Sequence, residues 1–163
     1  MLMNSVYASN NYVEMDNSAK CNEILSICVC LRLRKASRLV TRSYDDVLRP
    51  VGLRSTQLPI LVALSLTHSA PMSVLADQLV MDRTTLTRNL RPLEERGLVE
   101  VVAGEDKRTR EVKLTIQGRE AVAKAIPLWD KAQGYAVEAL GEGQLQRLHD
   151  SLSQLLSSPG GHQ

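Results

Sequence analysis

The chain has 163 residues, of which 44% are apolar, 23% are charged and only 3% are aromatic, and phenylalanine is absent. This composition is that of one globular domain of ordinary size, and it excludes a wholly disordered chain or a collagen-like repeat. With so few aromatic side chains, the core must be built from Leu, Val, Ile and Ala. Proteins that stack single-stranded bases on Phe and Tyr are disfavoured for the same reason.

The net charge is only +2, but positive charge is concentrated in the middle of the chain. Residues 26–119 contain 16 Lys and Arg against 10 Asp and Glu, whereas the two flanks contain 4 against 8. This distribution is a modest indication of a polyanionic partner, although ordinary solvated helix faces also produce it. The longest apolar stretch is too short for the ~20 residues of a membrane span, and three clustered cysteines do not form a secreted disulfide framework. We therefore expect a cytoplasmic protein with no membrane partner.

The first part of the chain is expected to contain a polar arm followed by one long helix. Residues 1–20 lack hydrophobic periodicity and are expected to form a flexible arm. The apolar pattern that follows predicts a helix from about Asn22 to Leu48, and Pro50 and Gly52 end it.

Three helices are predicted in the middle of the chain. The first, at about Ser55–Thr67, has Ser55 as a candidate N-cap and is apolar nearly all round, which indicates burial. A short helix at about Val74–Val80 follows. The third, residues 82–96, has Asp82 as its N-cap and Gly97 at its end, and Pro92 is expected to kink or loosen it. Its apolar stripe consists of Leu86, Leu90 and Leu93.

The apolar period then changes from 3.6 to 2, which predicts a β-hairpin. Its strands lie near residues 99–103 and 111–114, and its tip lies at about Gly104–Thr109. A long helix from about Ile116 to Leu140 follows, with Thr115 as its N-cap and an expected bend at Pro127. The last predicted helix, Glu142–Ser157, carries a leucine stripe, and residues 159–163 form a frayed tail.

The order of helix, short helix, capped helix and hairpin predicts a winged helix-turn-helix, in a mainly α fold with a small β-hairpin wing. The first turns of a helix that enters the major groove must offer side chains able to bond base edges and phosphates. Helix 82–96 carries such side chains, and they are expected to project away from its leucine stripe. They are those of Arg83, Thr84, Thr87 and Arg88. The alternative is a solvated face of an ordinary surface helix.

The hairpin tip adds positive charge to a projecting ribbon. An arginine such as Arg108 can enter a narrow minor groove, where the potential is most negative. Asp106, two residues earlier, is placed to hold that guanidinium by a forked hydrogen bond. A soluble turn of mixed charge is the alternative.

The pattern Asp106-x-Arg108-x5-Leu114-Thr115-x-x-Gly118 resembles the wing-to-helix signature of the MarR family of transcription regulators. The stretch SVLADQLVMDRTTLTRNLRPLEERGLVE resembles the family's helix-turn-helix, and GLRSTQLPILVAL resembles the helix that precedes it. The resemblance implies a homodimer in which the first and last helices of two chains interlock. Its two winged domains would meet successive major grooves of a pseudo-palindromic operator in double-stranded DNA.

The resemblance divides the chain into five segments and gives roles to individual residues. The segments are an arm (1–20), an N-terminal dimerisation helix (21–52), the winged DNA-binding domain (53–118), C-terminal dimerisation helices (119–158) and a tail (159–163). Family residues that read the major groove match Thr84, Thr85, Thr87 and Arg88. Arg108 matches the minor-groove residue of the wing, and Asp106 matches the residue that orients it. Arg83 and Lys107 are assigned to phosphate.

The resemblance also implies release from DNA by a small aromatic or anionic ligand, or by an oxidant. Cys30 falls where the family's organic-peroxide sensors carry their reactive cysteine, and Tyr44 falls at one of their hydrogen-bonding tyrosines. The chain departs from that pattern at the other tyrosine, where Arg34 stands. The alternative is that Cys28 and Cys30 are small apolar fillers of a helix.

We therefore expect a transcriptional regulator, by default a repressor, without a cofactor or a metal site. A thiol-based redox enzyme using Cys30 and a protein-binding winged helix without DNA contact are the alternative functions. Trp129 and Tyr135 are expected in the core or at a dimer contact, with lining of a ligand pocket as the alternative.

Overall fold

The computed structural model describes residues 17–104, 106 and 109–157. These residues form two units, one that ends at Leu39 and one that begins at Val40, and each is considered by itself. Most of the expected arm, the whole of the tail 159–163, and the wing residues Lys107 and Arg108 lie outside the described residues.

The first unit contains helix α1 (Ser18–Ile27) and the beginning of helix α2 (Val29–Leu48). The prediction of one unbroken helix starting near Asn22 is wrong in two respects, since α1 begins at Ser18 and the helix is interrupted at Cys28, whose ψ is 113°. β-branched side chains and cysteines, which are modest helix formers, occupy positions 27–30. At the break the Ser26 carbonyl oxygen accepts a hydrogen bond from Arg32 Nε at 2.6 Å.

In the second unit α2 ends in a 3-10 turn, Arg49–Val51, which Gly52 closes with a φ of +66°. The guanidinium of Arg96 donates hydrogen bonds to the carbonyl oxygens of Val51 and Gly52, so the residue that follows helix α5 (Arg83–Glu95) holds this turn in place. The stop expected at Pro50 and Gly52 is confirmed.

Helix α3 (Leu58–Thr67) begins three residues later than predicted, so Ser55 is not its N-cap. Pro59 near the first turn of α3 fixes the start, because proline needs no amide partner there. The backbone amide of Ser55 instead donates to Asp45 Oδ1 at 2.7 Å, and that of Arg54 donates to Gln57 Oε1 at 3.0 Å. The predicted burial of α3 holds on one face, where five of its side chains are buried, namely Leu58, Ile60, Leu61, Ala63 and Leu64.

Helix α4 (Met72–Gln78) and helix α5 form the predicted helix-turn-helix. Asp82 is the N-cap of α5, and its Oδ1 accepts a hydrogen bond from the Thr85 amide at 2.8 Å. The predicted leucine stripe of α5 is buried. The helix continues through Pro92 to Glu95, so the proline does not end it.

Three antiparallel strands form the sheet, in the order β1 (Ser69–Pro71), β3 (Arg110–Leu114) and β2 (Val99–Ala103). Strands β2 and β3 are the predicted hairpin, with Val101 opposite Val112. Strand β1 was not predicted, because three residues are too few to show a period of 2 and Pro71 reads as a helix terminator. Its pairing with β3 attaches the wing to the end of α3.

Helix α6 (Ile116–Leu140) has the predicted bounds and the predicted N-cap. The hydroxyl of Thr115 accepts from the Gly118 amide at 3.0 Å and donates to the Gly97 carbonyl oxygen at 2.7 Å. Gly118 packs so closely against the residue before β2 that a Cβ there would overlap the Leu98 carbonyl oxygen. The Leu-Thr-x-x-Gly pattern is therefore the joint between the wing and α6.

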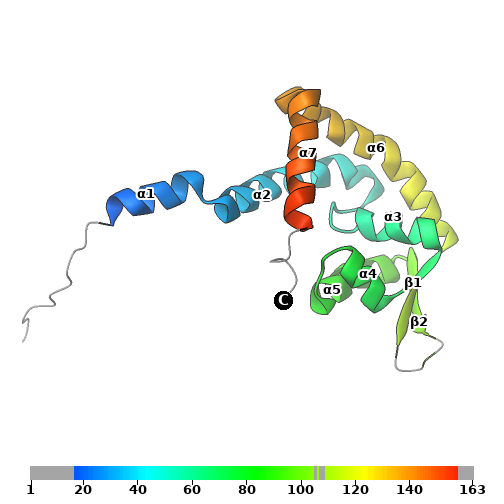
Figure 1. Cartoon of the computed structure of the whole chain (residues 1–163). Coiled ribbons are helices and arrows are strands. Elements are labelled where there is room, and N and C mark those ends of the chain that lie inside the picture. Colours follow the sequence, from blue (N-terminus) through cyan, green and yellow to red (C-terminus); the bar gives the residue numbers. More distant parts are fainter. Residues whose placement is uncertain (1–16, 105, 107–108, 158–163) are drawn as a thin grey trace, which may run out of the picture. The chain divides into compact units, whose positions relative to one another are not determined.

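Helix α7 (Glu142–Leu156) closes the second unit after Gly141. In Figure 1, α4, α5 and the hairpin lie at one end of this unit, and α6 leads away from the sheet towards its junction with α7. The buried core consists of Leu, Ile, Val and Ala side chains contributed mainly by α3, α4, α5, the sheet and the first half of α6, as the composition requires. No helix in the described part of the chain combines the length and the apolarity needed to cross a membrane.

Candidate nucleic-acid interface

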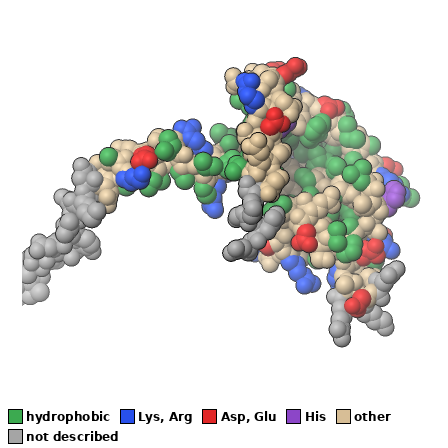
Figure 2. Space-filling view, viewed as in Figure 1, with side chains coloured by type: hydrophobic (Ala, Val, Ile, Leu, Met, Phe, Trp, Pro, Cys, Tyr) green, Lys and Arg blue, Asp and Glu red, His purple; other side chains and the backbone are tan. Residues whose placement is uncertain are grey.

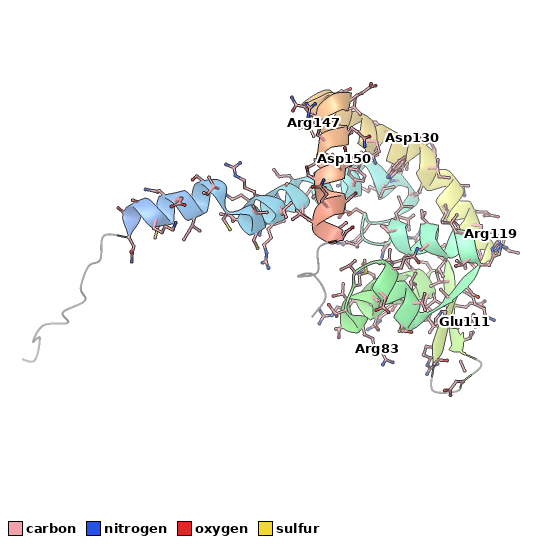
Figure 3. The ribbon with its side chains drawn as sticks, in the orientation of Figure 1. Arg83, Glu111, Arg119, Asp130, Arg147 and Asp150 are labelled. Atoms are coloured by element: carbon pink, nitrogen blue, oxygen red, sulfur yellow. The ribbon has the colours of Figure 1, made fainter. Side chains whose placement is uncertain are left out.

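Helix α5, the predicted recognition helix, presents a polar face opposite its buried leucines. The side chains of Arg83, Thr84, Thr87 and Arg88 are exposed, as the sequence predicted. In Figure 3 Arg83 projects from the end of the second unit where α5 and the hairpin lie, and Figure 2 shows Lys and Arg side chains along that edge. Two guanidinium groups and two hydroxyls on one helical turn and a half are the side chains that bond guanine edges and phosphates.

Hydrogen bonds within α5 limit what its threonines can offer to a base. The Thr85 hydroxyl donates to Asp82 Oδ2 at 2.7 Å, and the Thr87 hydroxyl donates to the Arg83 carbonyl oxygen at 2.7 Å. In these positions the two threonine hydroxyls can still accept hydrogen bonds, for instance from the amino groups of adenine or cytosine. The threonine methyl groups match the methyl group of thymine. Thr85 is also half-buried, unlike Thr84 and Thr87.

The carboxylate of Asp82 is stabilised in its charged form. The hydrogen bonds from the Thr85 hydroxyl and amide hold the pKa of Asp82 below its ordinary value of 3.8, and the positive charge of Arg88 contributes in the same direction. A charged N-cap at the start of α5 fixes the first turn of the helix, which is the turn that carries Arg83 and Thr84.

The wing is tightened at its base by hydrogen bonds to the backbone. The Gly104 amide donates to the Thr109 carbonyl oxygen at 3.0 Å, and Thr109 donates to the Asp106 carbonyl oxygen through its amide at 2.8 Å and its hydroxyl at 2.7 Å. Asp106 is exposed. The partner expected for it, Arg108, and the neighbouring Lys107 lie outside the described residues.

A cleft of about 320 Å³ brings the recognition helix and the wing together. Arg83 from α5 and Arg110 from β3 both line it, as does Asp77 from α4, so one arginine from each of the two predicted DNA-contacting elements borders the same cleft. Arg110 was not selected as a site residue from the sequence. Its position directly after the wing tip was the available signal.

Asn89 is a second residue that sequence reasoning did not select. Its Oδ1 accepts a hydrogen bond from the Thr56 hydroxyl at 2.7 Å, and its Nδ2 donates to the Thr85 carbonyl oxygen at 2.9 Å. Asn89 therefore ties the middle of α5 to the segment before α3. No sequence pattern predicts this contact, because the two residues are 33 positions apart.

The redox candidates lie in different units. Cys30 is exposed on α2 in the first unit, as is Arg34, so the interpretation of Cys30 as a buried filler does not hold within one chain. Cys28 lies at the break between α1 and α2 and is partly buried. Tyr44 is half-buried in the second unit, and this burial raises the pKa of its hydroxyl above 10.0.

Comparison with known proteins supports this assignment of the elements. Residues 51–109 match the model described as MarR family. A crystal structure of the transcriptional regulator MosR of M. tuberculosis in complex with DNA is 40% identical, with a TM-score of 0.70 over 80% of this chain and 96% of that chain. The regulator MarR of E. coli, solved as a cysteine-to-serine mutant with operator DNA, is 24% identical and has a TM-score of 0.74 over 83% of this chain and 96% of that chain, which supports the fold.

A curated relative matches over a shorter stretch. The uncharacterized HTH-type transcriptional regulator YwoH of Bacillus subtilis is 32% identical over 84 residues, which are 52% of this chain and 61% of the relative. The matched stretch is thus about three fifths of that protein's length.

Proposed function

Because the chain belongs to the MarR family of transcriptional regulators, we propose that it is a homodimeric repressor that binds a pseudo-palindromic operator. It is a DNA-binding regulator and not an enzyme, since the family and its relatives are transcriptional regulators. The thiol-based redox enzyme is therefore no longer an alternative. A repressor that covers a promoter acts where the chromosome is, so its proposed location is the cytoplasm.

The observation that carries the proposal is the exposed polar face of α5 beside the wing, with Arg83 and Arg110 in one cleft. A partner protein could use the same face, but two paired cationic elements on a helix and a ribbon fit the grooves of a duplex better. The proposed arrangement places residues 82–96 in the major groove and the wing, 104–110, in the minor groove. The proposed contacts are made by Arg83, Thr84, Thr85, Thr87, Arg88, Asp106, Lys107 and Arg108.

Exposed apolar surface at both ends of the chain supports a dimer. Within the described part of one chain, none of the residues of α1 or α7 is buried. Both helices nevertheless carry large apolar side chains, and those of Ile24, Leu25, Ile27, Leu148, Leu155 and Leu156 are exposed. Such surfaces are costly in water and are covered in a two-fold assembly. Two winged domains in one dimer would contact half-sites about one helical turn apart, ~10 bp.

The proposal is tested by measuring the affinity of the protein for the intergenic DNA upstream of its own gene. Fluorescence anisotropy at several salt concentrations should show sequence-selective binding that weakens steeply with salt, because Lys and Arg release phosphate counterions. Footprinting should show two protected half-sites on one face of the duplex. Equal affinity for this DNA and for scrambled DNA of the same length would contradict the proposal.

Variants separate DNA contact from general charge effects. Arg88→Ala and Arg108→Ala should each weaken operator binding by about 1–3 kcal/mol without loss of the dimer. Arg147→Ala removes the same charge from α7, at a position that Figure 3 shows at the opposite end of the unit from Arg83, and it should leave the affinity unchanged. If the Arg147 variant loses as much affinity as the Arg88 variant, the assigned interface is wrong.

We also propose that an effector releases the DNA, and the exposed thiol of Cys30 makes an oxidant the second candidate class beside a small molecule. Under this hypothesis a hydroperoxide lowers operator affinity of the wild type, and Cys30→Ser abolishes the response. Tyr44→Phe tests the accompanying hydroxyl. Continued DNA release from the Cys30→Ser protein on addition of hydroperoxide would remove the thiol from the mechanism.

A further inference from the structure

One side of α5 carries a chain of side-chain hydrogen bonds that begins outside the helix. The Thr56 hydroxyl, in the segment before α3, donates to Asn89 Oδ1 at 2.7 Å, and Asn89 Nδ2 donates to the Thr85 carbonyl oxygen at 2.9 Å. The Thr85 hydroxyl in turn donates to Asp82 Oδ2 at 2.7 Å. These bonds connect the segment before α3 to the N-cap of α5, where the first turn of that helix begins.

Asn89 is a base reader by residue type, because asparagine bonds the edge of adenine. In the folded chain, however, both ends of its amide group are engaged by the protein. Its Oδ1 accepts from Thr56, and its Nδ2 donates to the backbone of α5 itself. The side chain is also half-buried, unlike those of Thr87 and Arg88. The geometry of Asn89 therefore suits a residue that holds α5 better than one that meets a base.

The two flanks of α5 are held by different parts of the second unit. At 3.6 residues per turn, Thr85 and Asn89 share one flank, which lies between the buried leucine stripe and the exposed Arg88. The other flank begins at Arg83, which borders the cleft shared with the wing. The hydrogen bond from Thr56 therefore holds α5 on the flank that faces away from the wing.

This bond constrains α5 in a way that its leucines do not. Apolar contacts are non-directional, so the buried leucine stripe mainly sets the distance of α5 from the core. A hydrogen bond depends on angle, so the Thr56–Asn89 bond also limits rotation of the helix about its own axis. A rotation of about 10° would move side-chain ends that lie about 5–6 Å from the axis by about 1 Å. Hydrogen bonds to base edges tolerate only about half of that displacement, whereas long Arg and Lys side chains can follow a phosphate.

From these features we infer that Thr56 and Asn89 are positioning residues for sequence recognition. Their hydrogen bond sets the rotation of α5 and thereby aligns the exposed polar face of that helix with base edges. The bond contributes to selectivity for the operator and not to the attraction of the protein for DNA in general. This inference rests on the proposed function, since it names the residues that align the proposed interface.

The test measures the affinity of the full-length protein for the DNA upstream of its own gene and for scrambled DNA of the same length, by fluorescence anisotropy. Thr56→Val keeps the shape of the side chain and removes the hydroxyl. It should weaken binding to the upstream DNA about three- to fivefold, the value of one hydrogen bond. Binding to scrambled DNA and the salt dependence should not change, because the phosphate contacts remain. Thr56→Ser keeps the hydroxyl and should bind both DNAs within about twofold of the wild type.

Thr67→Val is the matched control. Thr67 is exposed like Thr56, and its hydroxyl bonds the Ala63 carbonyl oxygen at 3.3 Å within α3. This variant also loses one hydroxyl bond within the protein, but away from α5, so the ratio of the two DNA affinities should stay unchanged. A purely structural role for Thr56 would lower the melting temperature and reduce both DNA affinities by the same factor. That result overturns the inference.

A double-mutant cycle tests whether Thr56 acts through Asn89. Asn89→Leu removes both hydrogen bonds of the amide group at similar volume, and it should weaken binding to the upstream DNA at least as much as Thr56→Val does. Adding Thr56→Val to Asn89→Leu should then weaken this binding by less than about twofold, because the shared bond is already absent. Losses that multiply, as for two independent contacts, overturn the inference. If Asn89→Leu does not fold, the Thr56 variants decide the inference on their own.

The outcomes distinguish this inference from the proposed function. If the wild type binds the upstream DNA and scrambled DNA equally, the proposed function fails and the inference fails with it. If the wild type is selective and Thr56→Val keeps that selectivity, the inference is wrong while the proposed function stands. Selectivity that falls in Thr56→Val and is retained in Thr56→Ser and Thr67→Val supports both.

Discussion

The winged domain and the two terminal helices use leucine and isoleucine in opposite ways. In α3, α5 and the sheet the large apolar side chains are mostly buried within one chain, whereas in α1 and α7 they remain exposed or only half-buried. Residues that pack against their own chain make a domain that folds by itself. In the proposed dimer, the apolar residues that do not pack against their own chain are covered by the second copy. The comparison teaches that hydrophobic periodicity identifies a helix but does not say which molecule covers its apolar face.

The largest expected difference between the two regions is in the free energy of unfolding that is lost when a leucine is replaced by alanine. Leu90 is 2% exposed and Leu155 is 52% exposed. Leu90→Ala should lower the free energy of unfolding by about 2–5 kcal/mol, because it leaves a cavity in the core. Leu155→Ala should leave the winged domain intact and raise the dissociation constant of the dimer. Urea denaturation and sedimentation at several protein concentrations measure the two effects, and equal loss of stability in both variants would remove the distinction.

Two glycines of α6 sharpen the comparison within a single helix. A Cβ at Gly118 would overlap the Leu98 carbonyl oxygen and lie 2.5 Å from Leu114 Cδ1, whereas a Cβ at Gly134 meets no atom of the described residues within 4 Å. Gly118→Ala should cost about 1–3 kcal/mol because the backbone beside β2 must move. Gly134→Ala should stabilise the helix by up to about 1 kcal/mol. Thermal unfolding of the two variants should therefore shift in opposite directions, and parallel shifts would contradict the packing at the joint.

A smaller effect is expected in the turn between α4 and α5. Val80 has a φ of +51° and a side chain that is 63% exposed, so it bears backbone strain without contributing much packing. Val80→Gly should raise the free energy of unfolding by about 0.5–1 kcal/mol, because glycine adopts this conformation without a steric penalty. Ala at the same position is the control and should recover little of the gain. A destabilised glycine variant would show that the valine side chain has a contact of its own.

The smallest expected effect is on the pH dependence of the recognition helix. The pKa of Asp82 is lower in the folded chain than its ordinary value of 3.8, so its contribution to stability is present above that value and is lost as the pH falls through the folded pKa. Asp82→Asn keeps an acceptor for the Thr85 amide but does not titrate. Melting temperatures of the wild type and the variant should therefore converge as the pH falls from about 5 towards 3. A constant difference over this range would contradict the role of the charge.

The elements that the sequence predicted well are those marked by a local chemical signal. Asp82 and Thr115 are N-caps, and Gly97 has the positive φ expected after a helix. Each of these residues acts on backbone groups only a few positions away, by a hydrogen bond or by a turn. A short stretch of sequence is therefore enough to predict where the helix begins or ends.

The features that the sequence did not reveal depend on contacts between distant residues. Ser55 was a candidate N-cap by type, but the Asp45 carboxylate ten positions earlier binds its amide, and α3 starts later. The Thr56–Asn89 hydrogen bond and a pocket bordered by Trp129 likewise need the folded chain to bring their members together. The break at Cys28 reflects a run of weak helix formers, which an apolar pattern does not register.

The joint at Thr115 has a consequence for how the protein meets a duplex. The Thr115 hydroxyl bonds both the Gly97 carbonyl oxygen after α5 and the Gly118 amide in the first turn of α6. Gly118 also packs directly against the residue before β2, so no space remains between α6 and that strand. The hairpin and α6 therefore move together as one rigid body, because no flexible segment separates them. A rotation of α6 by a few degrees would displace the far ends of β2 and β3 by about 1–2 Å, a fraction of the width of a groove, so a small change far from the DNA alters how the hairpin meets it.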